Sequence, residues 1–224
     1  MPSADHAAAD HSAFVRNNTT LQAPPLVPEI RLHLAAELTP LWQTSEFYLT
    51  ESNVEPPFWA FAWAGGQALA RWLLDNPDAV AGKHVLDVGA GSGRVAIAAA
   101  MAGASRVEAV DLDPVAAAAI EVNAAANGVA VTAWAGDASL IDPGPFDVIL
   151  TGDVCYARQE AHALTQWFKT AVLLGHTVLM GDPNRRFLPK RDLAKLADYV
   201  VPTPRDLEAN DETPASVWRF VLGG

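Results

Sequence analysis

The stretch Val-Leu-Asp-Val-Gly-Ala-Gly-Ser-Gly, residues 85–93, decides the fold of this chain. A short apolar run ends at Asp87, and three glycines then alternate with small residues: Gly89, Gly91 and Gly93. The alanine-rich residues 94–101 follow directly and are typical of a buried helix. A strand, a tight glycine turn and the start of a helix bring backbone N–H groups close to a nucleotide-like ligand. Glycine is needed where a Cβ would block that approach.

The spacing of the glycine loop distinguishes two classes of cofactor. A dinucleotide fingerprint reads Gly-x-Gly-x-x-Gly and holds pyrophosphate at the helix N-terminus. Here the pattern is Asp-x-Gly-x-Gly-x-Gly, and an acid so close to the turn repels pyrophosphate but suits a cofactor with ammonium and sulfonium groups. The loop resembles motif I of the class I S-adenosylmethionine (SAM)-dependent methyltransferases. The resemblance implies that Asp87 and the three glycines bind SAM and its product, S-adenosylhomocysteine.

A second acid follows at the end of the next predicted strand, residues 106–111. Asp111 lies about 20 residues beyond the glycine loop, where a carboxylate accepts hydrogen bonds from the two hydroxyls of a ribose. The alternative role, capping a helix, better suits Asp113, because a proline follows it at the first helical position. We therefore expect Asp111 to bind the cofactor.

A third acid, Asp137, follows the predicted strand 129–134. The methyltransferase pattern implies that Asp137 accepts a hydrogen bond from the adenine amino group and that the amide of Ala138 meets the ring. Acids at three successive strand ends are much harder to obtain by chance than one glycine loop. Together they predict a SAM-dependent methyltransferase core.

The remaining sequence alternates between strand and helix. The predicted strands cover residues 146–151, 176–180, 199–202 and 216–222, and the predicted helices cover residues 158–173 and 188–198. Strands separated by helices predict a mostly parallel sheet that is covered on both faces. We therefore expect an α/β, Rossmann-like class I methyltransferase fold, with a doubly wound, seven-stranded, mostly parallel sheet and an N-terminal extension.

The predicted extension precedes a SAM-binding core at residues 77–224. Residues 1–20 lack a periodic apolar pattern, so we expect a flexible N-terminus there. Residues 21–76 form the extension, with a possible strand at 29–34, an aromatic cluster at 58–63 and a helix at 67–75. Trp63 lies close to two glycines, and we expect its ring to form a wall of the site for the cofactor or the target amine. The alternative for the whole aromatic cluster is packing in the core.

Composition limits the possible partners and compartments. The chain has 224 residues with a formal net charge of −11, which argues against a broad nucleic-acid surface. No apolar run reaches the ~18 residues that span a bilayer. The single cysteine, Cys155, excludes an intramolecular disulfide and is typical of a reducing compartment, and the first ten residues resemble neither a secretory signal nor a transit peptide. We expect a cytoplasmic monomer without a metal site.

The acceptor site is expected at residues 151–156, Thr-Gly-Asp-Val-Cys-Tyr, after the fourth strand. The two prolines with which nucleobase amine methyltransferases grip a flipped base are absent. Asp153 and Tyr156 instead form Asp-x-x-Tyr, which resembles the acceptor motif of the seven-β-strand protein lysine methyltransferases. That resemblance implies that Asp153 holds the lysine ammonium and that Tyr156 lines its slot. The alternatives are a helix cap for Asp153 and a core position for Tyr156, and Cys155 fits a small buried residue better than a nucleophile.

The resemblance extends from about residue 14 to residue 222. Residues 56–67, 152–156 and 181–183 are similar to the electron transfer flavoprotein β-subunit lysine methyltransferase family. One departure is Asn184, where the family pattern has glycine after the proline. The resemblance implies a protein-lysine N-methyltransferase whose partner is the β-subunit. A small-molecule or other-protein N-methyltransferase, and a SAM-binding module without turnover, remain the alternatives.

Two further segments have open roles. The basic residues between 185 and 195 are either a solvated helix face or a contact with an acidic patch on a partner protein. Residues 21–57 either help to dock a folded substrate or close over the cofactor as a lid.

Overall fold

The chain is described by a computed structural model that covers residues 4–35, 57–203 and 211–221, with side chains from residue 11 onward. A seven-stranded sheet has the order β5-β4-β3-β6-β7-β9-β8. Its strands are β3 (His84–Val88), β4 (Arg106–Asp111), β5 (Thr132–Ala135), β6 (Val148–Gly152), β7 (Thr177–Asp182), β8 (Leu193–Pro202) and β9 (Glu212–Phe220). The first five are mutually parallel, whereas β9 pairs antiparallel with both β7 and β8. The predicted α/β fold with a seven-stranded, mostly parallel sheet is confirmed.

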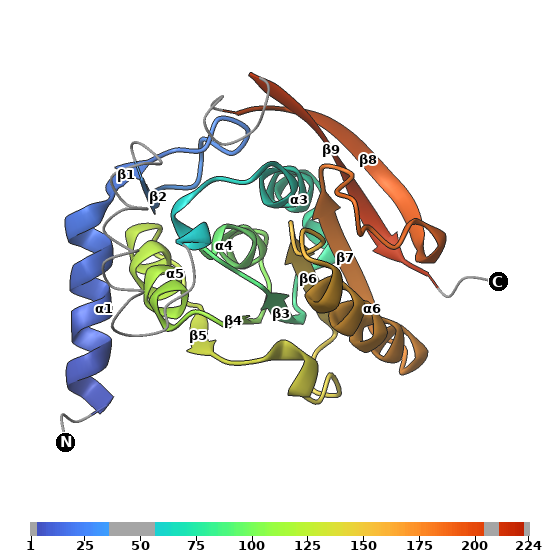
Figure 1. The fold of residues 1–224 in the computed structure, drawn as a ribbon, viewed down its shortest axis with the longest axis horizontal. Coiled ribbons are helices and arrows are strands. Elements are labelled where there is room, and N and C mark those ends of the chain that lie inside the picture. The colour runs from blue at the N-terminus through green and yellow to red at the C-terminus, as the bar shows by residue number, and fades with distance from the viewer. Residues whose placement is uncertain (1–3, 36–56, 204–210, 222–224) are drawn as a thin grey trace.

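Helices cover both faces of the sheet (Figure 1). The helices are α1 (Ala4–Asn18), α3 (Ala64–Asp75), α4 (Arg94–Met101), α5 (Pro114–Ala126) and α6 (Arg158–Leu173), and single 3-10 turns lie at Phe58–Ala60, Pro77–Ala79, Ala138–Leu140 and Lys190–Asp192. Apolar residues of α3, α4 and α5 pack on one face of the sheet, and those of α6 pack on the other. Among the described helices, none has the length and apolarity needed to cross a membrane.

The N-terminal segment differs from the prediction, because residues 4–18 form α1. Alanine has a high helix propensity, and the helix gains tertiary support from α5. Val15 is fully buried there beside Val115, Ala119 and Val122. The sequence did not predict this helix, because residues 1–20 show no periodic apolar pattern.

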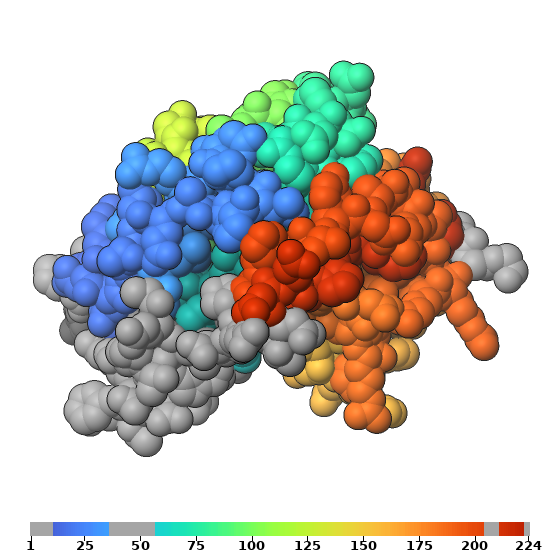
Figure 2. All heavy atoms as spheres, turned by 90° about the horizontal axis from the view of Figure 1, so that it is seen from above, coloured from blue at the N-terminus to red at the C-terminus, as the bar shows by residue number. Residues whose placement is uncertain are grey.

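The first part of the extension is a hairpin that is tied to α5. Strand β1 (Thr20–Gln22) pairs antiparallel with β2 (Leu32–Leu34), so the strand expected at 29–34 is shorter than predicted. The side chain of Asn123 accepts a hydrogen bond from the amide of His33 at 2.7 Å, and Asn127 accepts one from Arg31 at 2.8 Å. Figure 2 shows the N-terminal segment in blue on the same face of the molecule as α3 in teal and the C-terminal strands in orange and red.

The helix predicted at 188–198 is wrong. After a single 3-10 turn the chain forms β8, which runs beside β9 along its whole length. The register between the two strands shifts between Lys195 and Ala197, and this irregularity interrupts the alternation that would have identified a strand. Beyond it, Ala197, Tyr199 and Val201 are more buried than their neighbours, as expected for one face of a sheet.

Glycines allow α3 to lie directly against the sheet. A Cβ on Gly181 of β7 would collide with the carbonyl of Gly65, and one on Gly152 of β6 would lie 2.9 Å from the Cα of Gly66. Side chains at these positions would push the helix away. The close approach places the N-terminus of α3 at the carboxyl ends of β6 and β7, the edge at which ligands bind in sheets of this kind.

Asp182, the last residue of β7, is completely buried. One carboxylate oxygen accepts a hydrogen bond from the amide of Arg185 at 2.7 Å, and the other has no hydrogen-bond partner among the described residues. Burial, and to a smaller extent the charge of Asp153, raises the pKa of Asp182 to about 6. Ionising this side chain therefore costs the folded protein stability.

The pKa of Asp182 predicts a pH dependence of stability. Its folded-state pKa lies above the unfolded value, so the stability that the protonated Asp182 side chain contributes is lost as the pH rises from about 4 to above 6. Asp182→Asn removes the ionisation. We expect its free energy of unfolding, relative to wild type, to rise by about 2–3 kcal/mol between pH 4 and pH 8, measured by urea unfolding. Asp78→Asn, on an exposed turn, is the control, and an equal pH response of both variants would contradict the assignment.

Candidate active site

A cleft of about 530 Å³ opens at the carboxyl ends of β3, β4, β5 and β6. Eight of the ten site residues predicted from the sequence line it: Trp63, Gly89, Gly91, Asp111, Asp137, Ala138, Asp153 and Tyr156. The other two do not line it: Asp87 lies on β3, before the glycine loop, and Gly93 is the last glycine of the loop. The fold thus brings the predicted cofactor residues and the predicted acceptor residues to the walls of one cavity.

The glycine loop has a backbone that other residues rarely adopt. Gly89, Gly91 and Gly93 all have positive φ, at 62°, 53° and 77°. A Cβ on Gly89 would also lie 2.8 Å from the side chain of Val154, and one on Gly93 would lie 2.9 Å from Ile120 of α5. Gly89 therefore keeps the cleft wall open, whereas Gly93 allows α4 to start against α5.

Asp87, on β3, supports the glycine loop by a hydrogen bond to α4. One carboxylate oxygen accepts a hydrogen bond from the amide of Ala96 at 2.9 Å, and the other is buried with no hydrogen-bond partner among the described residues. Burial raises the pKa of Asp87 to about 8, although the charge of Arg94 opposes this rise. An unpaired buried acid beside a cradle of glycines fits the cationic amino-acid end of SAM.

The acids after β4 and β5 are preoriented by local hydrogen bonds. Asp111 accepts hydrogen bonds from the amides of Gly91, at 2.8 Å, and Asp113, at 3.1 Å. Asp137 accepts from the amide of Ser139 at 2.9 Å and from its hydroxyl at 2.7 Å. Asp113 accepts from the amide of Val115 and caps α5, as the sequence indicated. Asp111 therefore links the glycine loop to the next strand end.

Asp153 joins the acceptor motif to α3. Its carboxylate accepts hydrogen bonds from the amides of Gly65, at 3.1 Å, and Gly66, at 2.6 Å, and forms an ion pair with Arg185 at 3.2 Å. It lies in the left-handed region, with φ at 61°, and is 8% exposed. A capping role was the open alternative, but the helix that it caps is α3, since the N-cap of α6 is Ala157 and no side chain caps that helix.

Aromatic rings form one wall of the cleft. The ring of Phe58 lies 5.6 Å from that of Tyr156 and 6.2 Å from that of Trp63, measured between centroids. The indole of Trp63 donates a hydrogen bond to the carbonyl of Phe58 at 2.8 Å, and the guanidinium of Arg185 lies 5.6 Å from the Trp63 ring. Trp59 also lines the cleft but is 3% exposed and packs into the core.

Two residues of the acceptor motif differ sharply in exposure. Tyr156 is 56% exposed, so a core position for it is excluded. Cys155 is buried, and burial raises the pKa of its thiol to about 12. A thiol with such a pKa carries almost no thiolate at neutral pH, which agrees with a small buried residue and not with a nucleophile.

Three residues near the site were not among the predicted site residues, although Phe58 belongs to the aromatic cluster and Arg185 to the basic segment that the sequence showed: Phe58, Arg94 and Arg185. Arg94 is buried at the start of α4, and its guanidinium donates a hydrogen bond to the carbonyl of Trp63 at 3.2 Å. Burial lowers its pKa to about 10, while the charges of Asp153 and Asp87 oppose that change. The only sign of Arg94 in the sequence was its position as a basic residue within an apolar helix. Arg185 follows Asn184, whose φ of 68° shows that asparagine here takes a backbone region that favours glycine.

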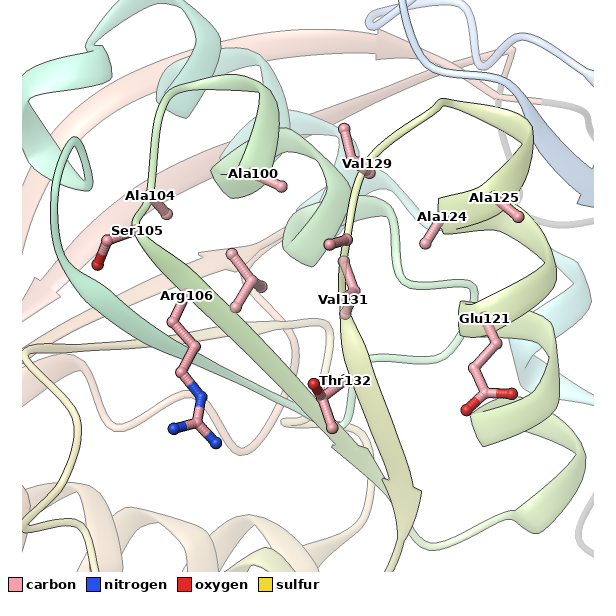
Figure 3. Close-up of a pocket in the computed structure, with 12 residues that line it drawn as sticks. Ala100, Ala104, Ser105, Arg106, Glu121, Ala124, Ala125, Val129, Val131 and Thr132 are labelled. Atoms are coloured by element: carbon pink, nitrogen blue, oxygen red, sulfur yellow. The ribbon is translucent and has the colours of Figure 1, made fainter.

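A second hollow, of about 510 Å³, lies at the opposite edge of the sheet. Figure 3 shows it between α4, α5 and the beginnings of β4 and β5, lined mainly by small apolar side chains, with Arg106 and Glu121 at its border. Ligands of doubly wound sheets bind at the carboxyl ends of the strands, so we assign the cofactor to the first cleft. Among the described residues, no group of three or more His, Cys, Asp or Glu side chains could hold a metal ion.

Solved structures with similar folds include one that is named as a methyltransferase. Trm5b from Pyrococcus abyssi is 17% identical, with a TM-score of 0.55 over 91% of this chain and 56% of that one. Magnesium protoporphyrin IX methyltransferase from Synechocystis is 15% identical, with a TM-score of 0.51 over 69% of this chain and 81% of that one. At these identities the likeness concerns the fold, which is of the class I methyltransferase type.

Sequence comparison identifies the family. The profile described as Ribosomal protein L11 methyltransferase (PrmA) matches residues 70–152. The electron transfer flavoprotein beta subunit lysine methyltransferase of Rattus norvegicus is 39% identical over 93% of this chain and 83% of that protein, and its counterpart in Homo sapiens is 38% identical over 93% and 81%. The chain therefore belongs to the electron transfer flavoprotein β-subunit lysine methyltransferase family and is a SAM-dependent methyltransferase.

Proposed function

We propose that this enzyme methylates lysine side chains on the β-subunit of electron transfer flavoprotein. The observation that carries the proposal is the position of Asp153 and Tyr156 in the same cleft as the glycine loop, beside a wall of aromatic rings. The relatives, which are named for this activity, support the choice of substrate. The cleft has an acid and aromatic faces, which together attract an alkylammonium group.

Positioning the lysine amine and removing water from it provide most of the rate acceleration that the protein must supply. A lysine amine has a reference pKa of about 10.4, so it arrives as an ammonium and must lose a proton, which we assign to water. Bound SAM supplies an electrophilic methyl group to the resulting neutral amine. Tyr156 and Phe58 surround the alkyl chain of the lysine, and each aromatic face attracts a cation by roughly 0.5–2 kcal/mol. Holding the amine in line for attack is the main contribution of the cleft.

In this proposal the two groups of acids have separate roles. Asp111 and Asp137 hold the ribose and the adenine, since they lie at the ends of β4 and β5 on the side of the glycine loop. Asp153 presents its charge to the lysine at the end of β6. Because three donors already hold its carboxylate, Asp153 also keeps α3 and the aromatic wall in place.

A folded substrate would gain orientation from a docking surface. We propose that part of residues 21–57 contributes to that surface; of these, only residues 21–35 and 57 are described. The support is the attachment of the β1–β2 hairpin, through the side chains of Asn123 and Asn127, to α5, whose first turn lines the cleft with Ala116. The alternative is a lid that closes over the cofactor.

The cofactor assignment predicts the effect of filling the glycine loop. Gly89→Val should abolish SAM binding, because its side chain would occupy the wall of the cleft and clash with Val154. Titration calorimetry with SAM, S-adenosylhomocysteine and NAD measures this. Gly175→Val is the control: Gly175 also has positive φ, but no atom lies within 4 Å of a Cβ there. Tight binding of NAD by wild type without a response to SAM would contradict the assignment.

Comparing variants of Asp153 and Asp111 distinguishes a role in binding the lysine from a role in binding SAM. Asp153→Asn should leave SAM affinity nearly unchanged and reduce kcat/KM for the protein substrate by roughly 10- to 100-fold, since charge-assisted hydrogen bonds are worth about 1.5–3 kcal/mol. Asparagine retains one oxygen that can accept from the start of α3. Asp111→Asn should mainly weaken SAM binding. If both variants lose SAM affinity equally, the role proposed for Asp153 is wrong.

The substrate is tested with the intact β-subunit and with a peptide that contains its target lysine. With methyl-labelled SAM, we expect mass spectrometry to locate methyl groups on lysines of the intact subunit and to find the peptide a poor substrate, because a peptide loses the orientation that docking provides. An unlabelled intact subunit would refute the proposed substrate. Equal catalytic efficiency on the subunit and the peptide would instead refute docking and leave the extension as a lid.

A further inference from the structure

Arg185 places a fixed positive charge in the cleft that receives the target lysine. Its guanidinium donates a hydrogen bond from Nη2 to Oδ1 of Asp153 at 3.2 Å, and its guanidinium carbon lies 5.6 Å from the centroid of the Trp63 ring. An acid and an aromatic face are the two kinds of group that attract an alkylammonium ion. Arg185 therefore already interacts with both kinds of group in the cleft.

The backbone holds Arg185 at this position. Its amide donates a hydrogen bond to the carboxylate of Asp182 at 2.7 Å, and Asn184, between the two, has a φ of 68°. Asp182 is the completely buried last residue of β7, so the turn is anchored in the sheet. Because these contacts involve the backbone of Arg185, a substitution of its side chain should preserve the turn. The sequence placed Arg185 in a basic segment with an open role, and its side chain pairs with Asp153 inside the molecule.

A fixed cation beside the acceptor acid favours the neutral form of an incoming amine. A neighbouring like charge disfavours an ammonium, and an acid that is already paired stabilises an ammonium less. An arginine keeps its own charge at any pH at which enzymes work. Such effects are strongest where little water screens them, and Asp153 is only 8% exposed. Only the neutral amine can accept a methyl group, so the charge of Arg185 acts on the step that precedes transfer.

Other ionisable groups surround this pair. Arg94 attracts Asp153, and burial lowers the pKa of Arg94 to about 10, so it is charged at neutral pH. Burial raises the pKa of Asp182 to about 6 and that of the Cys155 thiol to about 12, so neither has its midpoint between pH 7 and pH 9, whereas burial raises the pKa of Asp87 to about 8. The other ionisable side chains that line the cleft are those of Asp111, Asp113, Asp137, Tyr156 and Glu160. All of these groups are common to wild type and Arg185 variants, so the difference between the proteins reports the charge of Arg185.

We propose that Arg185, acting through Asp153, favours the neutral amine form of the bound target lysine and so makes it a methyl acceptor near neutral pH. The inference rests on the proposed function and deepens it, because it assigns the residue that lowers the cost of losing the proton. One N–H bond of the ammonium breaks, its electron pair remains on nitrogen, and the proton passes to water. Arg185 is thus a positioning residue, which neither takes the proton nor bonds to the lysine.

The test compares Arg185→Gln with wild type on the intact β-subunit, and kcat as a function of pH reports the ionisation of the bound lysine. We expect the midpoint of the rise in kcat to move up by about one pH unit or more in the variant. The variant's kcat should then fall roughly tenfold at about pH 7 and approach that of wild type at about pH 9.5. Its KM at neutral pH should fall as well, because Asp153 is released to bind the ammonium. A merely structural role of Arg185 would lower kcat at every pH and would not lower KM.

Two further variants separate the charge of Arg185 from its other contributions. Arg185→Lys retains a positive charge and should keep a pH profile closer to that of wild type than Arg185→Gln does. Arg186→Gln is the control, since it removes the next charge along the chain, which is exposed and is not among the residues that line the cleft. An equal loss of kcat by Arg185→Gln at every pH, or a pH profile identical to that of Arg186→Gln, would overturn the proposal.

Nuclear magnetic resonance provides a readout that needs no turnover. A peptide with a single central lysine, isotopically labelled at Cε, is bound to the enzyme together with S-adenosylhomocysteine, and the Cε chemical shift is followed with pH. In wild type the midpoint should lie below about 10.4, the reference value of lysine, and in Arg185→Gln it should lie closer to that value. Equal midpoints in the two proteins would refute the role of Arg185. If wild type leaves the subunit unmethylated but the midpoints differ as expected, the proposed substrate fails and the role of Arg185 stands.

Discussion

The hydrogen bonds from the start of α3 to Asp153 are the constraint on which the rest of the site depends. The amides of Gly65 and Gly66 donate to a carboxylate that follows β6. They can reach it only because glycines in α3, β6 and β7 let backbone approach backbone. The helix thus begins at the acceptor motif, and the aromatic residues just before it are brought over the cleft. Together with the hydrogen bond from Arg94 to the carbonyl of Trp63, this link positions Trp63 and Phe58 relative to the glycine loop.

Beneath this link, buried charges alternate in sign. Arg94 is attracted to both Asp87, before the glycine loop, and Asp153, at the acceptor motif, and Arg185 pairs with Asp153 from the other side. Arg94 and Asp153 would each be costly to bury alone and each offsets part of the cost of the other, whereas burial keeps Asp87 mostly protonated at neutral pH. We infer that the cofactor end and the acceptor end of the cleft share one electrostatic support, since Arg94 faces an acid of each.

The sequence was most informative where chemistry and local geometry coincide. The glycine loop, the acids at three strand ends and Asp-x-x-Tyr are local patterns, and eight of the ten predicted site residues, Trp63 from the aromatic cluster among them, line one cleft. The sequence was least informative where the interacting residues are far apart along the chain. Asp153 accepts a hydrogen bond from Gly65, 88 residues earlier in the first turn of α3, and no local pattern shows this. The helix expected at 188–198 is a strand, because an irregularity near Lys195 hides its alternation, and tertiary contact with α5 stabilises α1 where no periodic pattern was visible.

The Asp153 carboxylate already accepts two hydrogen bonds and pairs with Arg185, and these contacts limit its attraction for an incoming lysine. An ammonium held by a fully available acid would be stabilised in the ground state and would release its proton reluctantly, yet only the neutral amine can accept a methyl group. Here two amides and Arg185 already share the negative charge, so its attraction for an ammonium is reduced. We infer that Asp153 guides the lysine to the cleft while Arg185 keeps that attraction weak enough for deprotonation.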